Sequence, residues 1–249
     1  MTRPPLIAVA HGSRDPRSAA TVHDLLGVIR AGAPELDVRA AFLDLSAPRL
    51  PDVLAAAHAD GHDEVVVVPL LLGSAYHARV DIPGAVARAA RRHPRLRIRV
   101  AEVLGPDAGL ESAALRRLAA AGADPSDRGL GVVLAGAGSS HAPANAAVRN
   151  VTDRWATRTG WAGVVAAFAA TARPDVPTAI ARLRSAGARR IAVGSWFLAP
   201  GLLPDRVAGH AVAEGALVAD PLGADPDVAG VVLSRYAAVA ESSVALRAS

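Results

Sequence analysis

Residues 64–72 read EVVVVPLLL, an unbroken apolar run that is rich in β-branched valine. A strand with one face in water alternates apolar and polar residues, whereas a strand covered on both faces shows a continuous run of this kind. Strands covered on both faces are typical of parallel sheets that lie between two layers of helices. The run therefore predicts a central strand of an α/β domain.

Shorter apolar runs and longer alanine-rich stretches alternate on both sides of this strand. Before residue 122 we expect further strands at 6–10, 38–43 and 97–102, and helices at 18–31, 50–59, 82–92 and 109–121. Strands that alternate with helices in this way form a parallel sheet with helices packed on it. We therefore predict the α/β class, with a small parallel β-sheet flanked by helices.

The pattern begins again after the turn-rich segment GADPSDRG at 122–129. An offset of 126 residues aligns 6–72 with the second half without a gap, and it matches prolines and glycines, for example Pro48 with Pro174. Later, Leu104-Gly105 matches Leu222-Gly223 after a deletion of about eight residues. The sequence thus predicts two tandem domains of one type, residues 1–123 and 128–249, with a cleft between them.

Composition limits the classes of function that remain. The chain contains no cysteine, so disulfides and thiolate metal sites are excluded, and histidine and carboxylate would have to hold any metal ion. All 27 basic residues are arginines, scattered and without interleaved aromatic residues, which argues against nucleic acid as a partner. No apolar stretch approaches the roughly 20 residues of a membrane span, and the short run at 6–10 is too short for a signal peptide. We expect a soluble, cytoplasmic protein.

Two histidines lie where a ligand site is expected. His11 and His77 each follow a predicted strand, and the carboxyl ends of parallel strands form the edge at which open α/β sheets bind ligands. The second repeat has Ala137 and Leu203 at these positions, so both histidines are missing from it together. The joint loss favours a functional role over a structural one.

Asp44 follows another predicted strand, and its counterpart in the second repeat is Ala170. Two imidazoles and one carboxylate suit a divalent first-row metal ion with open coordination positions. The alternative role for Asp44 is to cap the turn that follows it.

Small and basic residues surround the histidines. Gly12 and Ser13 open the first helix, where backbone N–H groups and the helix dipole favour an anion. Arg14, Arg17 and Arg79 are able to bind carboxylates in a bidentate manner. For each arginine taken singly, a solvated surface role is the alternative.

The motifs HGSRDP (11–16), FLDLSAP (42–48), PLLLGSAYHARVDIP (69–83) and LGPD (104–107) carry a family resemblance. Together they resemble the class II sirohydrochlorin chelatases, which insert cobalt or iron in the cobalamin and siroheme pathways. The resemblance is strong over about 6–107 and degenerate over 130–226. Asp44 departs from the pattern, because the family usually has glutamate there. The chain resembles the two-unit form of the family, with its active site kept in the first half.

The resemblance implies a role for each of these residues. His11 and His77 would bind the metal ion and act in catalysis, and Asp44 would add a ligand or orient a histidine. Gly12, Ser13, Arg14 and Arg79 would bind the tetrapyrrole. The implied substrates are sirohydrochlorin and a divalent ion (Co²⁺ or Fe²⁺, with Ni²⁺ a further option), with no organic cofactor and no ATP. The internal pseudo-dimer is compatible with a monomer.

Two other readings compete with this function. A non-catalytic carrier of metal or tetrapyrrole could use the same ligands. A histidine phosphatase is disfavoured, because its nucleophilic histidine follows an arginine, whereas Ala10 precedes His11. In the second half we interpret His141 as a surface or helix-start residue, with a role in the cleft as the alternative. We interpret Trp196-Phe197 with the segment PGLLPDR as an apolar rim that forms a substrate wall or packs on the first half.

Overall fold

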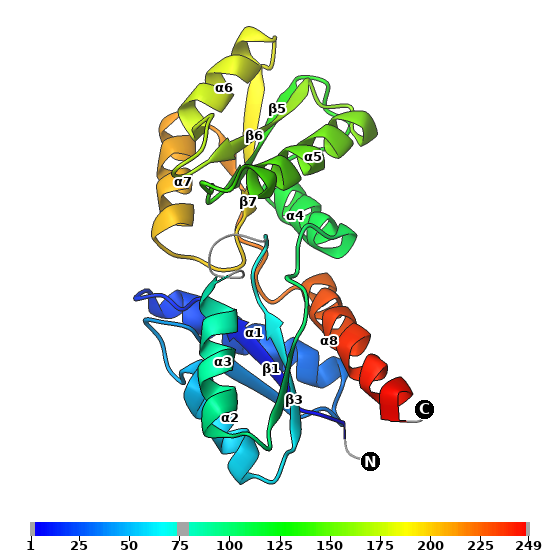
Figure 1. Ribbon diagram of the computed structural model, residues 1–249. Helices are drawn as coiled ribbons and strands as arrows, with labels where there is room; N and C mark the ends of the chain where they lie inside the picture. The colour runs from blue at the N-terminus through cyan, green and yellow to red at the C-terminus, as the bar shows by residue number, and fades with distance from the viewer. Residues whose placement is uncertain (1–2, 74–79, 248–249) are drawn as a thin grey trace. The chain divides into compact units, whose positions relative to one another are not determined.

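The computed structural model describes residues 3–73 and 80–247 and divides the chain into two compact units. Unit 1 comprises Met1–Asp107 with Ala224–Ser249, and unit 2 comprises Ala108–Gly223. Each unit is built around one parallel sheet of four strands, with helices packed on it (Figure 1). The predicted α/β class and the two tandem units are therefore confirmed. The predicted cleft between the halves stays a prediction.

Unit 1 has the strand order β2-β1-β3-β4. Its strands are β1 (Leu6–Ala10), β2 (Val38–Phe42), β3 (Glu64–Pro69) and β4 (Arg97–Val100), and its helices are α1 (Pro16–Gly32), α2 (Leu50–Ala59), α3 (Ile82–Arg92) and α8 (Pro226–Arg247). Helices α2 and α3 pack together against one face of the sheet, and α1 and α8 pack together against the other. Val65, Val66, Val67 and Val68 are fully buried as a result, which is what their unbroken apolar run predicts.

Unit 2 repeats this plan with the strand order β6-β5-β7-β8. Its strands are β5 (Leu130–Gly136), β6 (Gly163–Phe168), β7 (Arg190–Trp196) and β8 (Leu217–Val218), and its helices are α4 (Ala108–Ala120), α5 (Ala142–Arg158), α6 (Val176–Ser185) and α7 (Leu202–Ala213). Its core brings together residues of the strands β5, β6 and β7 with residues of α6 and α7.

The register of the two sheets follows the predicted offsets. Leu6 pairs with Val38 and with Val66, and 126 residues later Val132 pairs with Val164 and with Ala192. The last strand follows a different offset, since the β3–β4 pair Val66↔Arg99 corresponds to the β7–β8 pair Ala192↔Leu217. Arg99 and Leu217 lie 118 positions apart, which is eight fewer than 126. The predicted deletion of about eight residues is therefore confirmed.

Strand β3 is shorter than the predicted strand at 64–72. It ends at Pro69, although the N–H of Leu70 still donates to the carbonyl of Val9 at 2.8 Å. Proline has no N–H to donate to a neighbouring strand, so the strand ends at Pro69 and a loop follows. The apolar residues after Pro69 therefore belong to the edge of the sheet and to that loop.

The compact units differ from the sequence repeats in their last helix. Helix α4 closes the first repeat in sequence but packs on β7 of unit 2, and α8 closes the second repeat but packs on β3 of unit 1. The repeats predicted at 1–123 and 128–249 therefore exchange their last helices in the fold.

Each exchanged helix carries an arginine that donates hydrogen bonds to the turn before the other exchanged helix. The guanidinium of Arg117 donates to the carbonyl of Leu222 through Nη2 at 3.0 Å, and that of Arg235 donates to the carbonyl of Leu104 at 3.0 Å. Arg235 also donates to the carbonyl of Val103 and to the carboxylate of Asp107. Arg117 and Arg235 lie 118 positions apart, as Leu104 and Leu222 do, so the two contacts are equivalent.

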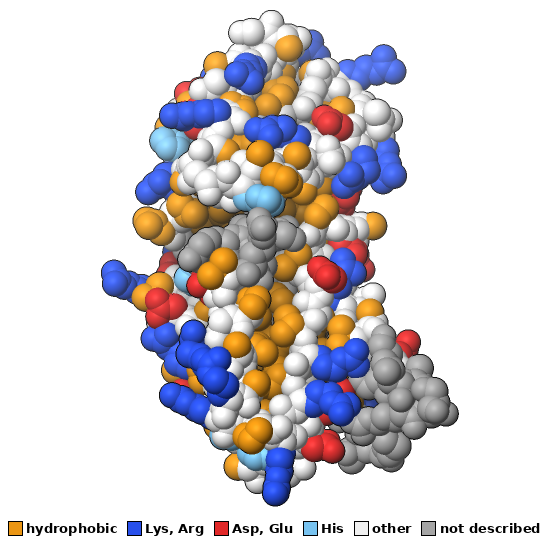
Figure 2. Space-filling model, in the orientation of Figure 1, with side chains coloured by type: hydrophobic (Ala, Val, Ile, Leu, Met, Phe, Trp, Pro, Cys, Tyr) orange, Lys and Arg blue, Asp and Glu red, His pale blue; other side chains and the backbone are white. Residues whose placement is uncertain are grey.

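Within the described chain, no helix combines the length and the apolar character that crossing a membrane requires. On the face shown in Figure 2, arginine side chains are scattered over both units and do not gather into one patch. The expectation that nucleic acid is not a partner stays a prediction.

Candidate metal-insertion site

His11 and Asp44 lie beside each other at the carboxyl edge of the unit 1 sheet. The loops after β1 and β2 are joined by two backbone hydrogen bonds, Leu43 N–H to the carbonyl of Ala10 at 3.0 Å and Asp44 N–H to the carbonyl of His11 at 2.8 Å. Adjacent parallel strands in register bring these two loops together. The predicted proximity of His11 and Asp44 is therefore confirmed.

Gly12 makes this junction possible. Its φ is +94°, and a Cβ placed on it would lie 1.6 Å from the carbonyl oxygen of Asp44. Only a residue without a side chain fits there, because the loop after β2 crosses directly over it. Gly12 thus has a conformational role next to His11, and its predicted contact with substrate stays a prediction.

Ser13 fixes the same junction through its backbone. Its N–H donates to Oγ of Ser46 at 3.1 Å, and Oγ of Ser46 donates back to the carbonyl of Ser13 at 3.0 Å. Oγ of Ser13 accepts a hydrogen bond from the N–H of Asp15, which caps α1. The Ser13 N–H is therefore engaged inside the loop, so an anion at this turn would have to be bound by other groups.

Asp44 is a permanent negative charge beside His11. The N–H of Leu45, which donates to the carboxylate, and the guanidinium of Arg49 hold the pKa of Asp44 below its usual range, and the charge of His11 contributes less. Oδ1 of Asp44 accepts a hydrogen bond from Nη1 of Arg49 at 2.7 Å. The side chain is 58% exposed. Asp44 is ionised at neutral pH and does not take up protons there, whereas a neutral imidazole can.

The basic residues around His11 differ in their surroundings. Arg14 is exposed, whereas Arg17 bonds the carboxylate of Asp15, and this contact lowers the pKa of Asp15. His77 and Arg79 lie outside the described residues. Among the residues that are described, no group of three or more histidine, aspartate and glutamate side chains could hold a metal ion. The predicted roles of His77, Arg79 and Arg14 stay predictions.

The second repeat keeps the backbone of this site and lacks its side chains. The N–H of Ala170 donates to the carbonyl of Ala137 at 3.0 Å, as Asp44 does to His11. Gly138 has φ +83°, and a Cβ on it would lie 2.0 Å from the carbonyl oxygen of Ala170. Unit 2 thus has the same loop junction without an imidazole or a carboxylate.

The side-chain hydrogen bonds that hold the backbone of Ser13 in unit 1 have an equivalent at Ser139 in unit 2. Ala172 stands in place of Ser46, and the side chain of Asn145 on α5 bonds both the N–H and the carbonyl of Ser139. His141 is the residue that precedes α5, as expected for a helix-start position, and its N–H donates to Oγ of Ser139.

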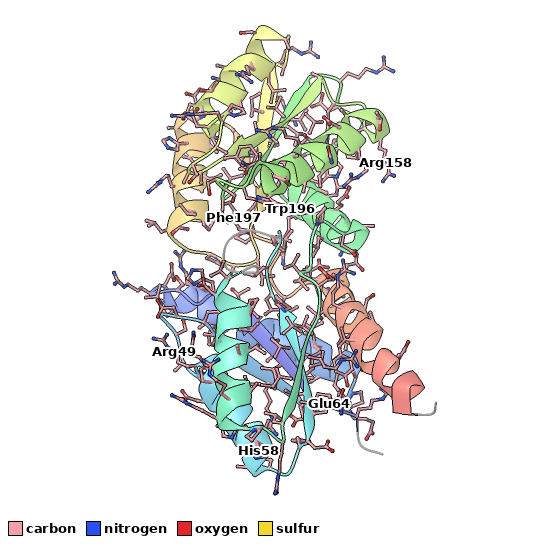
Figure 3. All side chains as sticks on the ribbon, in the orientation of Figure 1. Arg49, His58, Glu64, Arg158, Trp196 and Phe197 are labelled. Carbon is pink, nitrogen blue, oxygen red and sulfur yellow. The ribbon has the colours of Figure 1, made fainter. Side chains whose placement is uncertain are left out.

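The apolar wall predicted in unit 2 needs a correction at Trp196. Trp196 is buried, and Phe197 packs against the core of unit 2 at the carboxyl end of β7 (Figure 3). Large aromatic side chains at strand ends gain most by burial, so Trp196 is a core residue and is not available for stacking. Leu202, in the segment PGLLPDR, is 74% exposed.

Sequence reasoning missed the ion pair between Asp44 and Arg49 and the role of Ser46. The spacing of five residues between Asp44 and Arg49 gives no periodic signal, because the segment between them is an irregular turn. The hydrogen bonds of Ser46 to Ser13 also leave no signal in the repeat, because in unit 2 the equivalent bonds to Ser139 come from Asn145 on α5 and not from the position that matches Ser46.

The family model of CbiX matches residues 5–121 and 131–239 of the chain. The sirohydrochlorin cobaltochelatase of Priestia megaterium is 26% identical over 215 residues, which cover 81% of this chain and 66% of the relative. The sirohydrochlorin ferrochelatase of the same organism is 23% identical over 205 residues, which cover 81% of this chain and 76% of the relative. The match thus spans slightly less than two thirds of the cobaltochelatase.

The solved structure of SirB from Bacillus subtilis with Fe³⁺ has a TM-score of 0.82 to this chain. The two are 24% identical, and the match covers 98% of each chain. At this level of identity the likeness shows that the two chains share one fold.

Proposed function

The chain belongs to the CbiX family, and we propose that it inserts a divalent metal ion, Co²⁺ or Fe²⁺, into sirohydrochlorin. The observation that carries this proposal is the junction of His11 with Asp44 at the edge of the unit 1 sheet. The same junction in unit 2 has alanine at both positions. The names of the two Priestia megaterium relatives support both the substrate and the choice of metals.

Metal insertion requires a place for the ion and a base. The ion must shed its water stepwise, and two pyrrole N–H protons must leave the macrocycle. A neutral imidazole can do either task, because it binds first-row divalent ions and its pKa lies near neutrality. We assign both tasks to His11 and His77. The assignment of His77 rests on the sequence alone.

Asp44 supplies negative charge in this scheme. Its lowered pKa keeps it ionised at neutral pH. A carboxylate beside an imidazole orients the ring and stabilises a cation bound to it. Because Arg49 already occupies Oδ1 of Asp44, we assign Asp44 to orientation and charge, with direct ligation as the alternative.

The substrate is a polycarboxylate, so it requires positive charge around the metal. Arg14, which is exposed on the loop after β1, is suited to bind a carboxylate of the macrocycle. The sequence assigns the same task to Arg79. The absence of an organic cofactor, the cytoplasmic location and the monomeric state stay predictions.

A turnover experiment tests the proposal. The pure protein is mixed with excess sirohydrochlorin and Co²⁺ or Fe²⁺ without ATP, and the absorbance change of the macrocycle is followed beside a protein-free control. We expect many turnovers per chain at a rate above the control. Binding that stops at one equivalent, without acceleration, would instead identify a carrier of metal or tetrapyrrole.

A further inference from the structure

Unit 2 contains a cavity that the proposed metal site does not use. It lies between α4 and α5, has a volume of about 510 Å³, and is lined only by residues of unit 2. Cavities of this size fall within the range of small-molecule sites. The lining residues of α4 recur at helical spacing, at 108, 111, 112, 115 and 119, so one face of α4 forms one wall.

A comparison with unit 1 explains why the cavity is open. The counterparts of α4 and α5 there are α8 and α1, and Cδ1 of Leu233 lies 3.9 Å from the point where a Cβ on Gly32 would be. The counterpart of Gly32 in unit 2 is Arg158, and that of Leu233 is Leu115. A glycine lets two helices approach closely, whereas an arginine at the same place does not.

An ion pair on the cavity wall is also specific to unit 2. The carboxylate of Glu111 accepts hydrogen bonds from the guanidinium of Arg154 and, at 3.2 Å, from Nε1 of Trp155. The corresponding positions in unit 1 hold Ala229, Val28 and Ile29. A buried carboxylate must be paired, and here Arg154 and Trp155 satisfy both of its oxygens. The charge of Glu111 is thus balanced within the wall.

The remaining wall is mostly apolar, with the hydroxyl residues Ser112 and Thr159 and one positive charge. Trp155 and Trp161 meet edge to face with ring centroids 6.2 Å apart, and both indole N–H groups are used, by Glu111 and by the carbonyl of Asp124. Leu115 faces them from α4. Arg158 ends α5 (Figure 3), and among the described residues its guanidinium makes no ion pair or hydrogen bond.

We propose that the cavity between α4 and α5 binds a small aromatic carboxylate, with its ring against Leu115 and Ala119 of α4 and its acid group on Arg158. The aliphatic face of α4 suits a flat apolar body, and Arg158 can form a bidentate pair with a carboxylate. The proposal is independent of metal insertion, because every residue in it belongs to unit 2.

Calorimetric titration with 2-naphthoate and with the neutral 2-naphthylmethanol tests this site. We expect one equivalent of 2-naphthoate to bind per chain, and the alcohol to bind about tenfold more weakly, since one charge-assisted hydrogen-bond pair is lost. Absence of 2-naphthoate binding at millimolar concentration, or equal affinity for the two probes, would overturn the proposal.

Variants of the same protein locate the binding. Arg158→Gln should weaken 2-naphthoate about tenfold and leave the alcohol unchanged, and Ala119→Trp should fill the cavity and abolish the binding of both. Arg182→Gln on α6, which also removes one exposed charge from unit 2, is the matched control and should bind both probes as the parent does. Unchanged 2-naphthoate affinity in Arg158→Gln would place the ligand elsewhere. Thermal melting confirms that each variant is folded.

Discussion

The two halves of this chain share a backbone and differ in the side chains at one sheet edge. Strands β1 to β3 and β5 to β7 pair in the same register, and Gly12 and Gly138 sit under the same loop crossing. At that crossing unit 1 has His11 and Asp44, whereas unit 2 has Ala137 and Ala170. The comparison teaches that the fold requires the loop junction but does not require the imidazole and the carboxylate, to which we have assigned the chemistry.

The largest effect is expected where the halves are alike. Gly12→Ala and Gly138→Ala should each lower the free energy of unfolding by about 3 kcal/mol or more, because the new Cβ would overlap a carbonyl oxygen at positive φ. Gly61→Ala and Gly187→Ala are the matched controls, since these glycines also have positive φ but open space around the added Cβ. Urea denaturation should give about 1 kcal/mol for each control. Equal losses in all four variants would refute the steric argument.

A smaller effect is expected at the exchanged helices. Arg117→Met and Arg235→Met remove the donors to Leu222 and Leu104 while they keep the aliphatic length of the side chain. Each should cost about 1–3 kcal/mol in urea denaturation, with Arg235→Met the larger because Arg235 also bonds Val103 and Asp107. Arg182→Met serves as the surface control. A loss no larger than that of the control would show that these contacts do not hold the exchanged helices.

How far the sequence predicts the fold is clearest at these helices. The 126-residue offset predicted both sheets, and the matched glycines and prolines marked their turns. The exchange of α4 and α8 was not predicted, because Leu110 and Leu118 of α4 match Val228 and Tyr236 of α8 in burial. An apolar helix face indicates that the helix packs on a sheet but does not specify which of two similar sheets it covers. The one signal of the exchange in the sequence was the match of Arg117 with Arg235 at an offset of 118 instead of 126.

At the site, the sequence predicted that His11 and Asp44 belong together but not that Asp44 pairs with Arg49. Two strand ends in one register were enough to bring His11 beside Asp44. The contact between Asp44 and Arg49 depends on side-chain positions in an irregular turn, which no periodicity encodes.

The smallest effect concerns Asp44. Because its pKa is lowered, its charge is present above its usual pKa of about 4 and persists to still lower pH, so it does not change between pH 5 and 8. The acid limb of the rate profile between pH 5 and 8 should therefore come from a group other than Asp44. Asp44→Asn should reduce the insertion rate several-fold and leave the acid limb of the rate profile in place. Loss of the limb in this variant would assign it to Asp44 instead.

The central claim is that one catalytic centre exists per chain and that it lies in the first repeat. The initial rate of Co²⁺ insertion into sirohydrochlorin by His11→Ala, measured beside His141→Ala, tests it most directly. We predict that His11→Ala loses at least about 100-fold in rate and keeps the thermal melting point of the parent chain, whereas His141→Ala keeps the parent rate. A His11→Ala chain that inserts Co²⁺ at the parent rate would contradict the account.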